Sequence, residues 1–149
     1  MIINEEQREI SQIIIGQSKV AIELLEELLD IHKMERGQYQ LELRPVEPAR
    51  LIKKALAEQK LPLEKIRAKV ALSSDLPEGF KVPLDAFQIR MVFRNFLSNA
   101  VKHMPPEGNL TIRLFAVGRN EIEITFQNDG PQIPEERMQV IFDKFVQVL

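Results

Sequence analysis

Cysteine is absent from the 149-residue chain, which excludes disulfide bonds and thiolate chemistry and fits a reducing compartment. Net charge of one sign is also lacking, because 20 basic and 22 acidic residues leave a formal net charge of -2. No cluster of Lys and Arg supplies a local positive field, so nucleic-acid binding is not expected. No apolar run approaches the roughly 20 residues that span a bilayer, and the N-terminus has no secretion signal. We therefore expect no membrane segment here.

The first part of the chain reads as one long helix. Residues 5–34 contain no proline, and Gly37 is placed to end the helix. Apolar residues recur in it with helical spacing: Ile10, Ile13, Ile14, Val20, Ala21, Leu24, Leu25, Leu28, Ile31 and Met34. Roughly 30 residues project about 45 Å, farther than one small domain covers, so part of this apolar stripe needs a partner. We infer a helix-pairing or homodimer face.

The remaining residues predict an α+β domain, with helices on one face of a mainly antiparallel sheet. Alternating apolar residues favour short strands at 39–43, 69–73 and 80–84, and a hairpin over 109–128. Helices are expected over about 49–59, after a capping Asp85, and from Pro134 onward.

Three polar side chains on the helix after Asp85 are candidate ligands. Asn95, Asn99 and Lys102 are spaced by four and three residues, so they share a helix face. A carboxamide oxygen suits Mg²⁺, and a lysine is a point charge that suits phosphate. This predicts a Mg-nucleotide site, although the solvent face of an ordinary amphipathic helix has the same spacing.

The order of motifs favours the nucleotide site. The segment 94–103 resembles the N-box of the sensor histidine kinases, whose ATP-binding domain belongs with those of gyrase, Hsp90 and MutL (GHKL). Residues 128–134 look like the G1 box of that family, and 141–148 look like its F-box. Residues 28–37 are similar to the end of the second dimerisation helix. These four motifs occur in the order of the family and are spread over most of the chain.

This resemblance implies a domain organisation and a function. Residues 1–37 would be the second dimerisation helix, and 38–149 a truncated Bergerat-type α/β sandwich that binds ATP and Mg²⁺. In the family the ATP γ-phosphate passes to a histidine and then to a response regulator receiver domain. The chain is expected to be cytoplasmic, with any membrane-spanning part of a sensor lying elsewhere.

The resemblance also assigns roles to residues around the N-box. Asn99 matches the asparagine that binds Mg²⁺, and Asn95 a polar residue that orients the site, so these two are the candidate catalytic residues. Lys102 would meet phosphate. His103 takes the place of an aromatic near the nucleotide, with a surface histidine as the alternative interpretation.

The G1 and F-box resemblance supplies the rest of the predicted site. Asn128 stands where the family has the aspartate that accepts from the adenine amino group, and Asp129 could replace it in a shifted register. Gly130 allows close approach, and Ile133 offers an apolar wall. Gln132 replaces a usual glycine. The family uses phenylalanines such as Phe142 and Phe145 to anchor its lid; plain core packing is the alternative.

Two family features are missing from the sequence. Neither His32 nor His103 has the neighbours of a phosphoacceptor histidine, and residue 149 comes before any glycine-rich G2 box or last strand. We therefore expect this fragment of an ATP-dependent protein-histidine kinase to be inactive alone. The alternative is a non-catalytic, degenerate kinase-like scaffold or phosphotransferase-type module. A gyrase-like ATPase is disfavoured because Asn95 stands where those relatives carry a glutamate base.

Overall fold

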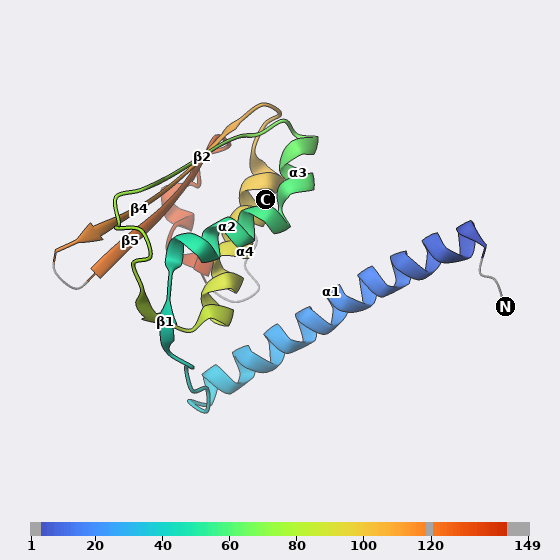
Figure 1. Cartoon of the computed structure of the whole chain (residues 1–149), viewed down its shortest axis with the longest axis horizontal. Helices are drawn as coiled ribbons and strands as arrows, with labels where there is room; N and C mark the ends of the chain where they lie inside the picture. The colour runs from blue at the N-terminus through green and yellow to red at the C-terminus, as the bar shows by residue number, and fades with distance from the viewer. Residues whose placement is uncertain (1–3, 119–120, 143–149) are drawn as a thin grey trace. The chain divides into compact units, whose positions relative to one another are not determined.

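The N-terminal unit is a single helix, α1. The computed structural model describes residues 4–118 and 121–142, and the chain divides into two units, Met1–Leu41 and Glu42–Leu149. Helix α1 spans Glu5–Glu35, as predicted (Figure 1). Asn4 caps it, because its side chain accepts from the Gln7 N–H at 2.8 Å while the Gln7 side chain accepts from the Asn4 N–H at 3.1 Å. Among the described residues, no helix is long and apolar enough to cross a membrane.

Gly37 ends α1 in the way the sequence predicts. Its φ is +64°, a left-handed conformation that glycine adopts without steric cost. The Gln38 N–H donates to the Lys33 carbonyl at 2.9 Å and the Gly37 N–H to the Met34 carbonyl at 3.0 Å. These two bonds satisfy carbonyls that the helix end would leave unpaired.

The second unit is an α+β fold with a mixed sheet, which confirms the predicted class. Its elements are β1 (Arg44–Val46), α2 (Pro48–Glu58), α3 (Lys60–Lys65), β2 (Lys69–Ser74), β3 (Val82–Leu84), α4 (Ala86–His103), β4 (Asn109–Val117), β5 (Glu121–Asn128), and the 3₁₀ helices η1 (Glu135–Arg137) and η2 (Val140–Phe142). The three-stranded sheet has the order β2-β4-β5, with β2 parallel and β5 antiparallel to β4 (Figure 1). Strands β1 and β3 form a separate antiparallel ribbon.

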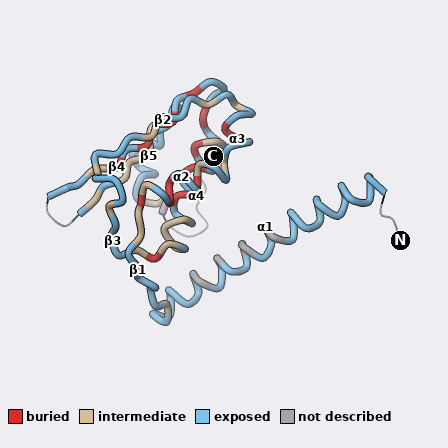
Figure 2. Tube along the Cα trace, in the orientation of Figure 1, coloured by how far each residue is buried: buried red, intermediate tan, exposed pale blue. Residues whose placement is uncertain are grey.

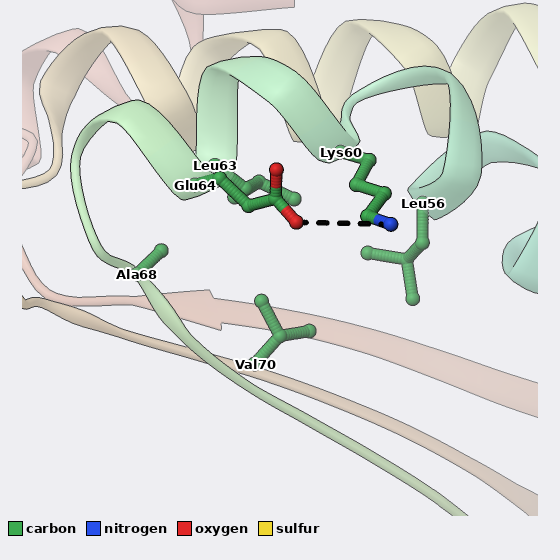
Figure 3. Close-up of a pocket in the computed structure, with 6 residues that line it drawn as sticks. All are labelled: Leu56, Lys60, Leu63, Glu64, Ala68 and Val70. Carbon is green, nitrogen blue, oxygen red and sulfur yellow. Dashed lines mark ion pairs between the residues drawn. The ribbon is translucent and has the colours of Figure 1, made fainter.

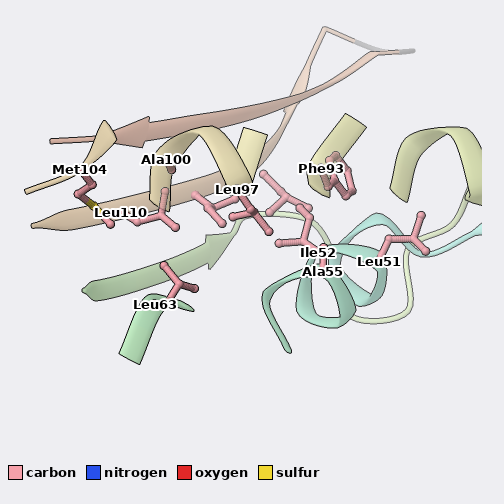
Figure 4. Close-up of a cluster of buried hydrophobic side chains, with 11 residues drawn as sticks. Leu51, Ile52, Ala55, Leu63, Phe93, Leu97, Ala100, Met104 and Leu110 are labelled. Atoms are coloured by element: carbon pink, nitrogen blue, oxygen red, sulfur yellow. The ribbon is translucent and has the colours of Figure 1, made fainter. Parts of the chain in front are cut away.

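Helices α2 and α4 cover one face of this sheet and enclose the core (Figures 2 and 4). Ile52 on α2, Leu97 on α4, and Leu110 and Ile112 on β4 are all completely buried. The two β4 residues are two apart, so they face the same side of the sheet. The core thus lies directly beneath α4 and holds that helix in place.

Three of the predicted elements differ in position, type or length from those in the structure. The strand expected at 39–43 lies instead at Arg44–Val46 and contains Pro45. Pro45 stands opposite Pro83, and two prolines can face each other because neither has an N–H to donate, as at a non-hydrogen-bonded position of an antiparallel pair. The helix expected from Pro134 is two short 3₁₀ turns, η1 and η2. The strand expected at 80–84 is shorter, at Val82–Leu84.

Candidate functional site

Asp85 fixes the start of α4, the helix that carries the candidate ligands. Its Oδ1 accepts from the backbone N–H groups of Phe87 and Gln88 at 3.1 and 3.2 Å, which confirms the predicted cap. Its Oδ2 accepts from the Glu42 N–H at 3.0 Å. Because Asp85 is only 7% exposed, both contacts lie largely out of water. The helix is therefore tied at its N-terminus to the segment leading into β1.

The polar face of α4 is open to solvent. Asn95, Asn99, Lys102 and His103 are all exposed, while the opposite face is buried in the core. Within the described part of the chain, no hydrogen bond or ion pair engages the side chains of Asn95, Asn99 or Lys102. Two amide oxygens and an ammonium group are therefore available to a ligand on that face.

The turn after β5 packs on the last residue of α4. A Cβ placed on Gly130 would lie 2.9 Å from the His103 carbonyl oxygen and 3.3 Å from Asn128 Nδ2. Only a glycine allows this approach without displacing backbone atoms. The turn and the end of the polar face of α4 are consequently direct neighbours, although 27 residues separate Gly130 from His103.

Asn128 and Asp129 in this turn have different environments. Asn128 Nδ2 donates to the Asp129 carbonyl at 2.9 Å, which leaves Oδ1 as the acceptor that the side chain can offer. Asp129 Oδ2 accepts from the backbone N–H of Asn109 at 2.8 Å and from Asn109 Nδ2 at 2.7 Å. These two bonds, the backbone one first, and the charge of Lys69 lower the pKa of Asp129 below its usual range.

Comparison with known proteins identifies the domain. Residues 84–148 match the family described as histidine kinase-, DNA gyrase B- and HSP90-like ATPases. The circadian input-output histidine kinase CikA of Synechococcus elongatus is 31% identical over 150 residues, which cover 98% of this chain and 19% of that protein. The adaptive-response sensory kinase SasA of Synechocystis is 28% identical over 129 residues, covering 85% of this chain and 33% of that protein. This chain carries a histidine kinase-type catalytic domain.

Solved histidine kinases share the fold of this catalytic domain. The catalytic domain of histidine kinase ThkA superposes with a TM-score of 0.67 at 24% identity, covering 71% of each chain. Full-length ShkA in complex with AMPPNP gives a TM-score of 0.77 at 20% identity, covering 99% of this chain and 31% of that one. The chain thus spans a third or less of the length of ShkA and of the curated relatives CikA and SasA.

Other predicted site residues of the histidine kinase-type domain are exposed or lie outside the described structure. Ile133 is 42% exposed and Gln132 is also exposed. Phe142 ends η2, and Phe145 lies outside the described residues, as does most of the F-box-like segment. Phe96 of α4 is 42% exposed and stacks on Phe126 of β5 with ring centroids 5.3 Å apart.

Asn109 is the residue near this turn that sequence reasoning missed. It begins β4, 20 residues before Asp129, and belongs to none of the motifs. Its contact arises only when β4 and β5 pair, with Leu110 opposite Asn128. The one local signal is its position after the Pro105-to-Gly108 turn, which sets where β4 starts.

A separate hollow of about 240 Å³ lies between α2, α3 and β2 (Figure 3). Its walls are Leu56, Lys60, Leu63, Glu64, Ala68 and Val70, with a Lys60–Glu64 ion pair of 3.8 Å at its rim. None of the predicted nucleotide-site residues lines it. Among the described residues there is also no cluster of three acidic or histidine side chains that could hold a metal.

Proposed function

We propose that this domain binds Mg-ATP against the polar face of α4 and the Gly130 turn, and that the whole kinase transfers the γ-phosphate to a histidine. The observation that carries the proposal is the packing of Gly130 on the His103 carbonyl. It joins two motifs from distant parts of the sequence into one surface. Open amide oxygens on one side and a glycine turn on the other suit a nucleotide.

Each residue of this surface has a chemical role in the proposal. The Asn99 amide oxygen would bind Mg²⁺, and Asn95 would orient the same region. Lys102 would bind phosphate, and the Oδ1 of Asn128 would accept from the adenine amino group. When bound, Mg²⁺ supplies charge neutralisation of the phosphates, and the protein groups supply position. His103 and Ile133 would border the base and ribose.

We infer two partners for the intact protein. A response regulator receiver domain would accept the phosphate from the histidine. The support is a solved structure with this fold, histidine kinase ThkA in complex with response regulator TrrA, which matches with a TM-score of 0.67. A second copy of the chain would cover α1, whose described apolar side chains are exposed, including Ile14 at 59% and Leu25 at 60%. Residues 1–37 and 38–149 would then be the dimerisation and ATP-binding parts.

The phosphate acceptor is expected to lie in another segment. His32 is exposed on α1 and lies 3.6 Å from Glu35, three residues on, without the neighbours of a phosphoacceptor histidine. We expect no labelling of the purified chain by γ-labelled ATP. The alternative function is a non-catalytic scaffold, which the neutral Asn128 and the bulky Gln132 favour because both weaken contacts to adenine.

Titration with Mg-AMPPNP separates these functions. We expect the wild-type chain to bind and Asn99→Ala to lose at least tenfold in affinity, which corresponds to about 1.4 kcal/mol. Ser98→Ala is the matched control, since Ser98 is an exposed neighbour on α4 outside the proposed site. Equal affinity in both variants would contradict the role of Asn99. Absence of binding by the wild-type chain would favour the scaffold.

A further inference from the structure

Asn109 and Asp129 are joined by three reciprocal hydrogen bonds. Two donors of Asn109, the backbone N–H and Nδ2, reach Asp129 Oδ2 at 2.8 and 2.7 Å. In return the Asp129 N–H donates to the Asn109 carbonyl at 3.0 Å. The side-chain distances fall in the range of about 2.7–2.9 Å typical of charge-assisted bonds, which are roughly twice as strong as neutral ones. Asp129 is thus held at both its backbone and its carboxylate.

We propose that this Asn109–Asp129 clamp positions the nucleotide-binding turn and so selects a base that carries an exocyclic amino group. The inference rests on the proposed nucleotide site. Because Asp129 is fixed, its carbonyl holds Asn128 Nδ2 at 2.9 Å, and the carboxamide keeps its oxygen as the outward acceptor. A turn released from the clamp lets that carboxamide rotate. The rotated group presents its NH₂ and no longer favours a donor on the base.

The location of the clamp fits a positioning role better than a purely structural one. Asn109 and Asp129 are both polar and exposed, and neither belongs to the hydrophobic core. The β4–β5 ladder beside them is already paired from Leu110–Asn128 to Val117–Glu121. The clamp lies beyond the end of this ladder, and its side-chain bonds act on the geometry of residues 128–130. The lowered pKa of Asp129 agrees with a carboxylate that stays ionised in these bonds.

The test compares two ligands whose bases differ only in the amino group: ADP and the diphosphate of purine riboside, both with Mg²⁺. Wild-type protein is expected to prefer ADP. Asn109→Ala loses one clamp bond, so the ratio of the affinities for ADP and the purine riboside diphosphate should fall at least threefold. Asp129→Ala loses both side-chain bonds, so the ratio should fall further. Gln127→Ala is the matched control, because Gln127 is an exposed neighbour on β5 whose side chain alternates to the other face of the sheet. Its preference should equal that of the wild type.

A swapped pair separates positioning from loss of folding. In N109D alone two carboxylates face each other, whereas in N109D/D129N the amide introduced at position 129 can donate to the carboxylate introduced at position 109 and accept from the backbone N–H of that position. We expect the single variant to lose the preference for ADP and the double variant to recover it, with thermal unfolding recorded for each. An unchanged preference in Asn109→Ala, or no recovery in the double variant, would overturn the clamp while leaving the nucleotide site intact. Failure of the wild-type chain to bind either ligand would overturn the proposed function and the clamp together.

Discussion

Gly130 illustrates how a missing side chain determines a site. A Cβ at this position would lie only 2.9 Å from the His103 carbonyl oxygen, so any other residue must push the turn away from α4. The nearest atom is a backbone oxygen, which cannot rotate aside as a flexible side chain would. Adding one carbon atom at position 130 would therefore disturb both the Gly130 turn and the end of α4, the two halves of the proposed nucleotide site.

We predict that Gly130→Ala lowers the free energy of unfolding by about 2 kcal/mol, since it adds a close contact to a strained backbone conformation. Urea denaturation measures this change. Gly79→Ala is the control, because Gly79 also has a positive φ, +71°, but nothing lies within 4 Å of its Cβ position. Its cost should stay at about 1 kcal/mol, that of an alanine in the left-handed conformation. Equal losses in the two variants would show that the contact with His103 is unimportant.

Asp129 gives a prediction about pH at the same scale. Its pKa is lowered by Asn109 and Lys69, so it stabilises the fold at pH values above an ordinary aspartate pKa of about 3.9. That stabilisation is lost as pH falls through the lower pKa of the folded state. An NMR titration of its carboxyl carbon should give a midpoint below the ordinary aspartate value of about 3.9, and Asn109→Ala should raise it. A midpoint at or above the ordinary value would contradict the clamp.

Residues of the site differ in how far the sequence reveals them. Asn95, Asn99 and Lys102 were predicted to share a face because helical spacing is local, and the structure has all three exposed on α4. Their role in binding stays a prediction. Asn109 was not predictable, because its partner lies 20 residues away and the contact depends on strand register.

Helices and strands also differ in whether they depend on residues nearby in the sequence or on distant segments. The hairpin over 109–128 and the cap at Asp85 were predicted correctly, because the alternation of apolar residues and the capping of a helix depend on residues close together in the sequence. Strand β1 lies later in the chain than predicted, because a proline favours the end of a strand, whereas Pro83 from a distant segment makes Pro45 acceptable within it. Pairing partners cannot be read from one strand alone.

The cap of α4 allows a graded prediction. Asp85→Ala removes the acceptor of two helix N–H groups and of the Glu42 N–H, so we expect a loss of about 2 kcal/mol in the free energy of unfolding. Asp85→Asn keeps one oxygen for the helix cap and gives up the contact with Glu42, so its loss should be about half. Urea denaturation of both variants distinguishes the two contacts. If both variants lose equally, the helix cap contributes nothing measurable.

At the scale of the whole molecule, the exposed apolar surface of α1 is the main feature to explain. Eleven of its described apolar side chains, among them Ile13 at 63% and Leu29 at 59%, are exposed in the single chain. A lone helix with this much apolar surface is marginal in water, because most helical stability in proteins comes from packing. Pairing with a second copy would supply that packing.

We predict that the chain forms dimers and that Leu25→Glu raises the dimer dissociation constant at least tenfold, since it places a charge on the apolar stripe. Sedimentation equilibrium gives the constant. Gln12→Glu adds the same charge to an exposed polar position of α1 and should leave the constant within twofold. A monomer at all concentrations, or equal effects of the two substitutions, would argue against pairing through α1.

The most direct test of the nucleotide site is NMR mapping of Mg-AMPPNP on the wild-type chain. Our account predicts that the side-chain amide signals of Asn95, Asn99 and Asn128 and the backbone signal of Gly130 shift together and saturate with one affinity. Signals from the hollow, such as those of Leu63 and Val70, should stay unchanged. Shifts confined to the hollow, or none at the three asparagines, would contradict the assignment of the ATP site to α4 and the Gly130 turn.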